Sequence, residues 1–306
     1  MFKLIVLHDP DDKEPPSAQT SLAHFIKVGK RLKTEILLRT MKDIDLTEGD
    51  ALFIRQTTMI GNGTYFIAKA AENLGIPVLD DSASIRICTD KVETYYRFKE
   101  AKVPQPETVI IRNGDIRIGF LSFPIVIKQP DSCFSRGVFK VDSLKELKEH
   151  PIINDRELVI QEYLPTAFDW RIGVLNNKVL YCAKYFMPKG HWQIVKRYPS
   201  GHHHLGGHEI LKLHDWPTDV CRLALQAAAC VGNGLYGVDI KETKKGLVVI
   251  EINDNPSIDS DAEGKYGVWE RIIERFKEMA HGRKSGHRKS INSRPDDLGG
   301  NSFHPG

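Results

Sequence analysis

The chain has 306 residues, of which 41% are hydrophobic and 27% are charged, and its formal net charge is +3. These values are ordinary for a soluble globular protein, and the length allows one large domain or two to three smaller ones. Basic residues are concentrated only near the C-terminal end, so we expect no nucleic-acid partner. No apolar stretch is long enough to span a bilayer, so we expect no membrane partner either.

The cysteines indicate the compartment. The chain has 5 of them, widely spaced and without a C-x-x-C pair, so neither a zinc site nor a thioredoxin-like motif is predicted. Such a pattern fits a reducing environment, and the N-terminal segment MFKLIVLHDPDD lacks the layout of a signal peptide. We therefore expect a cytoplasmic protein.

Strands and helices alternate over the first part of the chain. Hydrophobic patterning predicts a strand at 3–9, a helix at 20–33, strands at 35–40 and 51–57, a helix at 64–75 and a strand at 76–81. This alternation predicts a small parallel α/β domain over residues 1–85.

The second part of the chain, residues 86–280, has a different pattern. Thr89 is the expected N-cap of one helix and Ser143 that of a shorter one, and Lys128 is the single lysine of the apolar strand IVIK. Further predicted elements are strands at 157–164, 169–177 and 178–186, a helix at 218–232, a hairpin at 234–254 and a helix at 268–280. Residues 281–306 are polar and basic, and we expect them to form a disordered tail.

The predicted hairpin carries an unusual set of polar residues. If Lys244, Lys245 and Gly246 form a three-residue loop, Asp239 lies directly opposite Glu251. Directly opposed β-carbons lie roughly 5 Å apart, and two carboxylates at that separation repel each other unless a cation lies between them.

Asn253 lies two residues after Glu251 on the same strand face and adds a neutral oxygen. Few, hard oxygen ligands suit Mg²⁺, for which Mn²⁺ can substitute. The sequence therefore predicts one or two metal ions held by Asp239, Glu251 and Asn253. The alternative is a solvated polar face on an edge hairpin. Asp254 and Asn255 are expected to serve the turn before Pro256.

Several motifs in a fixed order resemble the ATP-grasp superfamily and, within it, the RimK-like carboxylate–amine ligases. The motifs are TDK, VPQPET, IVIK, SRGV, QEYL, DWR, GVDI and EINDNPSI. The resemblance implies an α/β fold in which the N-terminal domain precedes a two-subdomain, α+β ATP-grasp part. The lid subdomain would span about residues 105–165.

The resemblance also implies roles for individual residues. Lys91 and Lys128 would reach the nucleotide phosphates, and the loop 131–138 would fold over them. The implied ATP-binding residues are Lys91, Lys128, Ser135, Gly137, Gln161, Glu162, Tyr163, Leu164, Asp169 and Lys184, and the implied catalytic residues are Arg171, Lys128 and Arg136. Plainer alternatives stay open for each: an exposed helix lysine, a hairpin turn or a surface ion pair.

One stretch departs from the family pattern. After residue 183, relatives commonly carry arginines that face the phosphates, whereas this chain offers Lys184, Lys189 or Arg197 in their place, and the sequence does not decide among the three. Three consecutive histidines, His202 to His204, invite a metal interpretation, but consecutive side chains do not converge easily on one ion, and a polar loop over the substrate site is the alternative. His208 is equally undecided.

The implied activity is ATP-dependent ligation of a carboxylate to an amine through an acyl-phosphate. An amino acid such as glutamate is the expected substrate, the acceptor is a small molecule or a protein C-terminus, and a homo-oligomer is possible. One alternative is a degenerate ATP-grasp module that binds nucleotide for regulation or scaffolding. Another is a binder of anionic polymers through the basic tail, with Lys284, Arg288 and Lys289.

Overall fold

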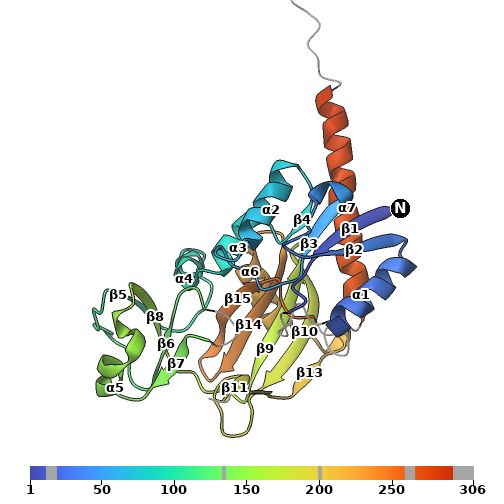
Figure 1. Cartoon of the computed structure of the whole chain (residues 1–306). Helices are drawn as coiled ribbons and strands as arrows, with labels where there is room; N and C mark the ends of the chain where they lie inside the picture. The colour runs from blue at the N-terminus through green and yellow to red at the C-terminus, as the bar shows by residue number, and fades with distance from the viewer. Residues whose placement is uncertain (12–18, 133–135, 199–201, 259–265, 292–306) are drawn as a thin grey trace, which may run out of the picture.

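The computed structural model describes residues 1–11, 19–132, 136–198, 202–258 and 266–291. The chain forms three main sheets, which follow one another in sequence and occupy different parts of the molecule (Figure 1). The first is parallel and the other two are antiparallel, which confirms the expected α/β class with an N-terminal parallel sheet.

The N-terminal sheet has the strand order β2-β1-β3-β4 and all its pairs are parallel. Its elements are β1 (Phe2–Leu7), α1 (Gln19–Arg31), β2 (Thr34–Arg39), η1 (Leu46–Glu48), β3 (Ala51–Ile54), α2 (Thr64–Asn73), β4 (Val78–Leu79) and α3 (Ser82–Cys88). Leu4 to Leu7 of the central strand β1 are fully buried, because parallel sheets of this kind are covered on both faces.

The second sheet has the order β5-β8-β6-β7 and lies apart from the first, within the range 105–165 (Figure 1). Its elements are β5 (Thr108–Arg112), β6 (Ile125–Lys128), β7 (Val138–Val141), α5 (Leu144–Glu149), η2 (Pro151–Asn154) and β8 (Glu157–Glu162). Ser143 caps α5 by accepting a hydrogen bond from the Glu146 N–H at 3.2 Å, as its sequence position predicts.

The third sheet has the order β13-β10-β9-β14-β15. Its elements are β9 (Phe168–Leu175), β10 (Lys178–Phe186), β13 (His208–Ile210), α6 (Thr218–Ala229), β14 (Leu235–Thr243) and β15 (Gly246–Asp254). A two-stranded ribbon, β11 (Val195–Arg197) with β12 (His203–Leu205), and the short η3 (Leu213–Asp215) lie between β10 and α6 in sequence. Small, buried alanines let α6 pack closely on this sheet.

The β14–β15 hairpin differs from its predicted form at the turn. Thr243 pairs with Gly246, so the loop has two residues instead of the predicted three. A β-bulge between Asp239 and Ile240 then shifts the register by one. The two differences cancel, and Asp239 lies opposite Glu251 as predicted.

The helix α4 (Lys91–Glu100) begins one residue later than Thr89 would require. Its N-cap is Asp90, whose carboxylate accepts hydrogen bonds from the N–H groups of Val92 and Glu93 at 2.8 and 3.1 Å. Thr89 instead ends α3, and its hydroxyl donates to the Ile85 carbonyl. The prediction of Thr89 as N-cap was wrong because the Asp90 carboxylate beside it accepts hydrogen bonds from two helix N–H groups.

The last described helix, α7 (Val268–Ile291), extends away from the body of the molecule (Figure 1). It overlaps residues 281–291 of the expected disordered tail, and residues 292–306 lie outside the described residues. Nearer its start, Trp269 and Phe276 are fully buried against the N-terminal sheet. No described helix has the length and apolar character needed to cross a membrane.

Arg55, which follows β3, joins the N-terminal sheet to the C-terminal part of the chain. Its side chain is 1% exposed and donates to the Asn255 side-chain oxygen at 2.5 Å and to the Pro256 carbonyl at 3.0 Å. The guanidinium also lies over the Phe53 and Trp269 rings. Asn255 has a left-handed φ of 48°, and Arg55 helps to hold this turn in place.

Replacing Arg55 by Met is expected to lower the free energy of unfolding by about 2–4 kcal/mol, because two buried oxygens lose their donor. Urea unfolding would measure the change. Arg31→Met is the matched control, since Arg31 also binds α7, through Glu270, but its side chain is 64% exposed. We expect it to cost under about 1 kcal/mol. Equal losses in the two variants would contradict this account.

Candidate active site

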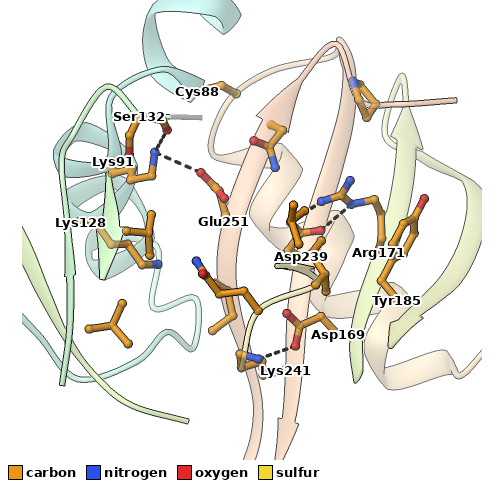
Figure 2. A pocket seen from close by; sticks show the side chains of 18 of the residues that line it. Cys88, Lys91, Lys128, Ser132, Asp169, Arg171, Tyr185, Asp239, Lys241 and Glu251 are labelled. Atoms are coloured by element: carbon orange, nitrogen blue, oxygen red, sulfur yellow. Dashed lines mark hydrogen bonds and ion pairs between the residues drawn. The ribbon is translucent and has the colours of Figure 1, made fainter. Parts of the chain in front are cut away.

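A cavity of about 310 Å³ lies where the three sheets meet. Figure 2 shows Lys91 and Lys128 on one side of it, Asp169, Arg171 and Tyr185 on the other, and Asp239 and Glu251 on the strands between them. The cavity is therefore lined by opposite charges that come from separate parts of the chain.

One row of charged side chains crosses three neighbouring strands. Arg171 on β9 lies opposite Asp239 on β14, which lies opposite Glu251 on β15. Arg171 forms two hydrogen bonds of 2.7 Å to the Asp239 carboxylate. This fork geometry is the strong form of an arginine–carboxylate pair, so Arg171 compensates one of the two facing acids.

Burial raises the pKa of Asp239, with Glu251 adding to the rise and Arg171 opposing it. Burial also acts to raise the pKa of Glu251, but Lys91 and Lys128 outweigh it and the net shift is downward. The cavity thus holds Glu251 ionised by placing two lysines near it.

Lys91 is the first residue of α4, and its ammonium lies 3.2 Å from Glu251 Oε1. The same ammonium donates to the Ser132 carbonyl. Ser132 directly precedes the part of the 131–138 loop that is not described. Lys91 therefore connects the β15 carboxylate to the start of that loop.

Lys128 ends β6 with its side chain turned toward the cavity (Figure 2), and the residue is only 8% exposed. Burial lowers its pKa to about 8, with Glu251 acting in the opposite direction. The side chain is therefore charged at neutral pH but loses its proton at mildly alkaline pH.

We expect the apparent Kd for ATP to rise roughly tenfold between pH 7 and pH 9, because Lys128 goes from roughly nine-tenths to one-tenth protonated. Only the protonated form attracts phosphate, so affinity is present below pH 8 and lost above it. Isothermal titration at both pH values measures the change. The Lys128→Arg variant stays charged and should bind ATP equally at both pH values. If the Kd for ATP changed with pH by the same factor in both proteins, Lys128 would not be the group responsible.

A second charged row lies two residues further along the same strands. Lys241 on β14 approaches Asp169 on β9, with Nζ 2.5 Å from Oδ1. Lys241 is a cavity residue that the sequence reasoning missed. Its i+2 spacing from Asp239 on one strand face is the signal that could have found it.

The segment Gln161 to Leu164 lines the cavity where β8 ends. The Gln161 amide donates to the Thr108 hydroxyl at 3.1 Å, and Glu162 accepts from the Glu107 N–H at 3.1 Å. The Tyr163 ring meets Trp192 edge to face, with centroids 6.0 Å apart. The segment is thus anchored beside β5, and its Tyr163 faces the Trp192 ring.

The structure does not bring every predicted residue to this cavity. Lys184 lies opposite Trp170, where it sits over the Phe168 and Trp170 rings and binds Glu209 at 3.3 Å. Because side chains alternate along a strand, Ala183 and Tyr185 share the face of Arg171 and Lys184 takes the other. Lys184 is therefore not placed to bind a ligand in the cavity.

The loop predictions have mixed outcomes. Arg136 is exposed, Gly137 is partly buried, and neither lines the cavity. Gly137 has a φ of 62°, and a Cβ there would lie 2.4 Å from the Gln129 side chain, so a glycine is required. Ser135 lies outside the described residues, as do the side chains of Arg197 and His203.

Sequence reasoning also missed several further lining residues: Thr57, Thr58, Cys88, Tyr185 and Asp254. Asp254 was assigned only to the turn, yet it is 7% exposed, and burial raises its pKa to about 7. Thr57, Thr58 and Cys88 come from the N-terminal part of the chain, and no sequence motif there marks them as lining residues.

Asp239, Glu251 and Asn253 all line the cavity. Among the described residues, no three His, Cys, Asp or Glu side chains gather as a metal site. The candidate set is therefore two carboxylates and an amide, which leaves most of a metal's coordination positions to water and phosphate. That composition fits Mg²⁺, which binds few protein ligands alongside substrate phosphates.

Residues 89–274 match the family model described as the RimK-like ATP-grasp domain. Among curated proteins, alpha-aminoadipate–LysW ligase LysX of Saccharolobus solfataricus is 26% identical over 259 residues, covering 76% of this chain and 88% of that protein. Glutamate–LysW ligase ArgX of Sulfolobus acidocaldarius is also 26% identical, over 224 residues, covering 68% of this chain and 74% of that protein.

Solved structures show the same fold at low sequence identity. A D-alanine–D-alanine ligase from Bacillus anthracis superposes with a TM-score of 0.71 at 18% identity, covering 94% of this chain and 100% of that one. A RimK domain ATP-grasp protein from Sphaerobacter thermophilus gives a TM-score of 0.65 at 17% identity, covering 87% of this chain and 96% of that one.

Proposed function

This chain belongs to the RimK-like ATP-grasp family and is an ATP-dependent carboxylate–amine ligase, and we propose that it joins an amino acid to its acceptor through an acyl-phosphate. The observation that carries this proposal is the cavity in which Lys91 and Lys128 face the acids of β14 and β15. This arrangement supports a role for the two lysines in binding the transferred phosphate and a role for the acids in holding a metal.

In the first step, a substrate carboxylate oxygen attacks the γ-phosphorus of ATP and ADP leaves. Lys91 and Lys128 supply positive charge for the phosphates, and their cavity positions support this role. Phosphoryl transfer depends mainly on positioning and on stabilising charge, so two lysines at low exposure are effective. Ser135, Arg136 and Gly137 belong to the loop 131–138, which would fold over the phosphates when ATP is bound; this role rests on the family resemblance of the sequence.

Asp239, Glu251 and Asn253 would hold one or two Mg²⁺ ions, with Mn²⁺ as a substitute. When bound, the metal would offset the negative charge of the phosphates. The fit rests on the oxygen donors that line the cavity and on the facing positions of Asp239 and Glu251. Arg171 and Lys91 now balance these two carboxylates, and a bound divalent cation would share that role.

In the second step, the amine nitrogen attacks the acyl carbon, the C–O bond to phosphate breaks, and an amide and inorganic phosphate result. Arg171 lies at the cavity wall beside Tyr185, with its guanidinium 5.1 Å from the ring centroid, and would stabilise the oxyanion of this step. Excluding water from the cavity during the reaction would protect the acyl-phosphate from hydrolysis.

ATP would lie with its adenine beside Gln161 to Leu164 and its ribose near Asp169. We propose an amino acid such as glutamate as a substrate, because the similar proteins LysX and ArgX are named for ligation of alpha-aminoadipate and glutamate to LysW. The acceptor is then a small molecule or a protein terminus. We also propose that the enzyme works in the cytoplasm, where the free thiols Cys88, Cys182, Cys221 and Cys230 would stay reduced.

The test is ADP release in the presence of a panel of amino acids and carboxylate acceptors, with product mass measured in parallel. We expect ADP formation that depends on both substrates and a product whose mass equals their sum minus water. ATP binding without any substrate-dependent turnover would instead support a nucleotide-binding regulatory module.

A further inference from the structure

Lys241 and Asp169 form an ion pair inside the cavity (Figure 2). The side chains are 12% and 16% exposed, respectively. The Lys241 ammonium also donates to the Thr166 hydroxyl at 2.7 Å, and that hydroxyl lies 3.1 Å from the same Asp169 oxygen, Oδ1. Lys241, Thr166 and Asp169 therefore form a closed three-member group.

The location of this pair suggests a role other than stability. A largely buried ion pair contributes little net stability, because removing two charges from water offsets their attraction. Its effect is geometric: both donors contact Oδ1, so the carboxylate plane of Asp169 cannot rotate freely. Within the described part of the chain Oδ2 accepts no hydrogen bond, and it belongs to a residue that lines the cavity.

We propose that Lys241 is a positioning residue for nucleotide specificity: with Thr166 it holds Asp169 by Oδ1, so that Oδ2 accepts a hydrogen bond from one ribose hydroxyl. This inference rests on the proposed placement of the ribose near Asp169. With Oδ1 already occupied, the carboxylate cannot bind the two ribose hydroxyls with one oxygen each, so its contact with the ribose centres on the one hydroxyl that Oδ2 meets best.

Direct binding of phosphate is an alternative role for Lys241, and the contacts favour it less. Reaching a phosphate would require Lys241 to leave both Asp169 and Thr166, and would leave the Asp169 carboxylate without its cation in a cavity wall. Lys91 and Lys128 already supply cations on the other side of the cavity (Figure 2). The two roles differ in a measurable way, because only positioning of Asp169 makes binding depend on a ribose hydroxyl.

The experiment compares ATP, 2′-deoxy-ATP and 3′-deoxy-ATP by isothermal titration against the full chain and its variants. We expect the wild type to bind one of the deoxy analogues about tenfold more weakly than ATP, the loss of one hydrogen bond to a charged acceptor. In Lys241→Met the preference should fall to about twofold or less, chiefly because ATP binds more weakly. Lys241→Arg should keep part of it.

Lys245→Met is the matched control, since Lys245 lies on the same hairpin with its side chain 84% exposed, and it should leave the preference unchanged. If Lys241→Met does not fold, Asp169→Asn tests the same hydrogen bond, and its preference for ATP over the deoxy analogue should fall in the same way. Equal binding of all three nucleotides by the wild type would overturn the proposal. A preference retained in Lys241→Met would overturn it too. Failure of the proposed ligase reaction is distinguishable, because it would abolish substrate-dependent ADP release and leave the nucleotide titrations intact.

Discussion

Glu251→Gln is expected to lower the turnover number for substrate-dependent ADP release by about 10²–10³-fold. Glu251 faces Asp239 across the hairpin, so the substitution removes one of only two carboxylates from the proposed metal set. The amide that replaces it keeps an oxygen but no charge. Binding of the divalent ion, and with it stabilisation of the transferred phosphoryl group, should weaken together.

A metal titration separates this effect from a loss of folding. The Mg²⁺ concentration for half-maximal activity should rise at least about tenfold in Glu251→Gln, whereas the exposed Glu274 of α7 offers a control in Glu274→Gln that should behave as wild type. Wild-type turnover and an unchanged Mg²⁺ requirement in Glu251→Gln would remove Glu251 from the metal set.

Lys128→Met is expected to lower kcat/KM for ATP by about a hundredfold at pH 7. Lys128 is 8% exposed at the end of β6. The substitution removes the ammonium group but keeps a similar side-chain volume. Charge in a poorly solvated cavity interacts strongly with phosphate, so one lysine has a large effect there. Steady-state kinetics with varied ATP would measure it.

Lys145→Met serves as the control, because Lys145 lies on α5 of the same lid region with an exposed side chain. It should change kcat/KM by less than about twofold, as surface charges interact weakly. Lys128→Arg should recover most of the activity. If Lys128→Met turned over ATP as the wild type does, the phosphates would have to bind elsewhere.

The acids of the hairpin could be found from the sequence because the information is local. Apolar residues at alternate positions of β15 define its buried face, which puts Glu251 and Asn253 together on the other. Predicting that Asp239 faces Glu251 required only the position of the nearby turn. Even so, the two-residue loop and the bulge show that the correct pairing came from two compensating differences.

Pairs that join distant strands could not be found in this way. Lys241 meets Asp169 because β9 lies beside β14, although the two residues are 72 positions apart. Lys184 was assigned to the nucleotide, but the pairing of β10 with β9 puts it on the face of Trp170. A shift of one residue in strand register moves a side chain to the opposite face, and no local pattern determines that choice.

The sequence by itself determined the family, the parallel N-terminal sheet and the identity of the acids on the hairpin, because motif order and strand periodicity are properties of neighbouring residues. Only the tertiary structure decided which cation pairs with which acid: Arg171 with Asp239, Lys91 with Glu251 and Lys241 with Asp169. The physical reason is that electrostatic partners are selected by distance in space, and the packing of three separate sheets sets those distances.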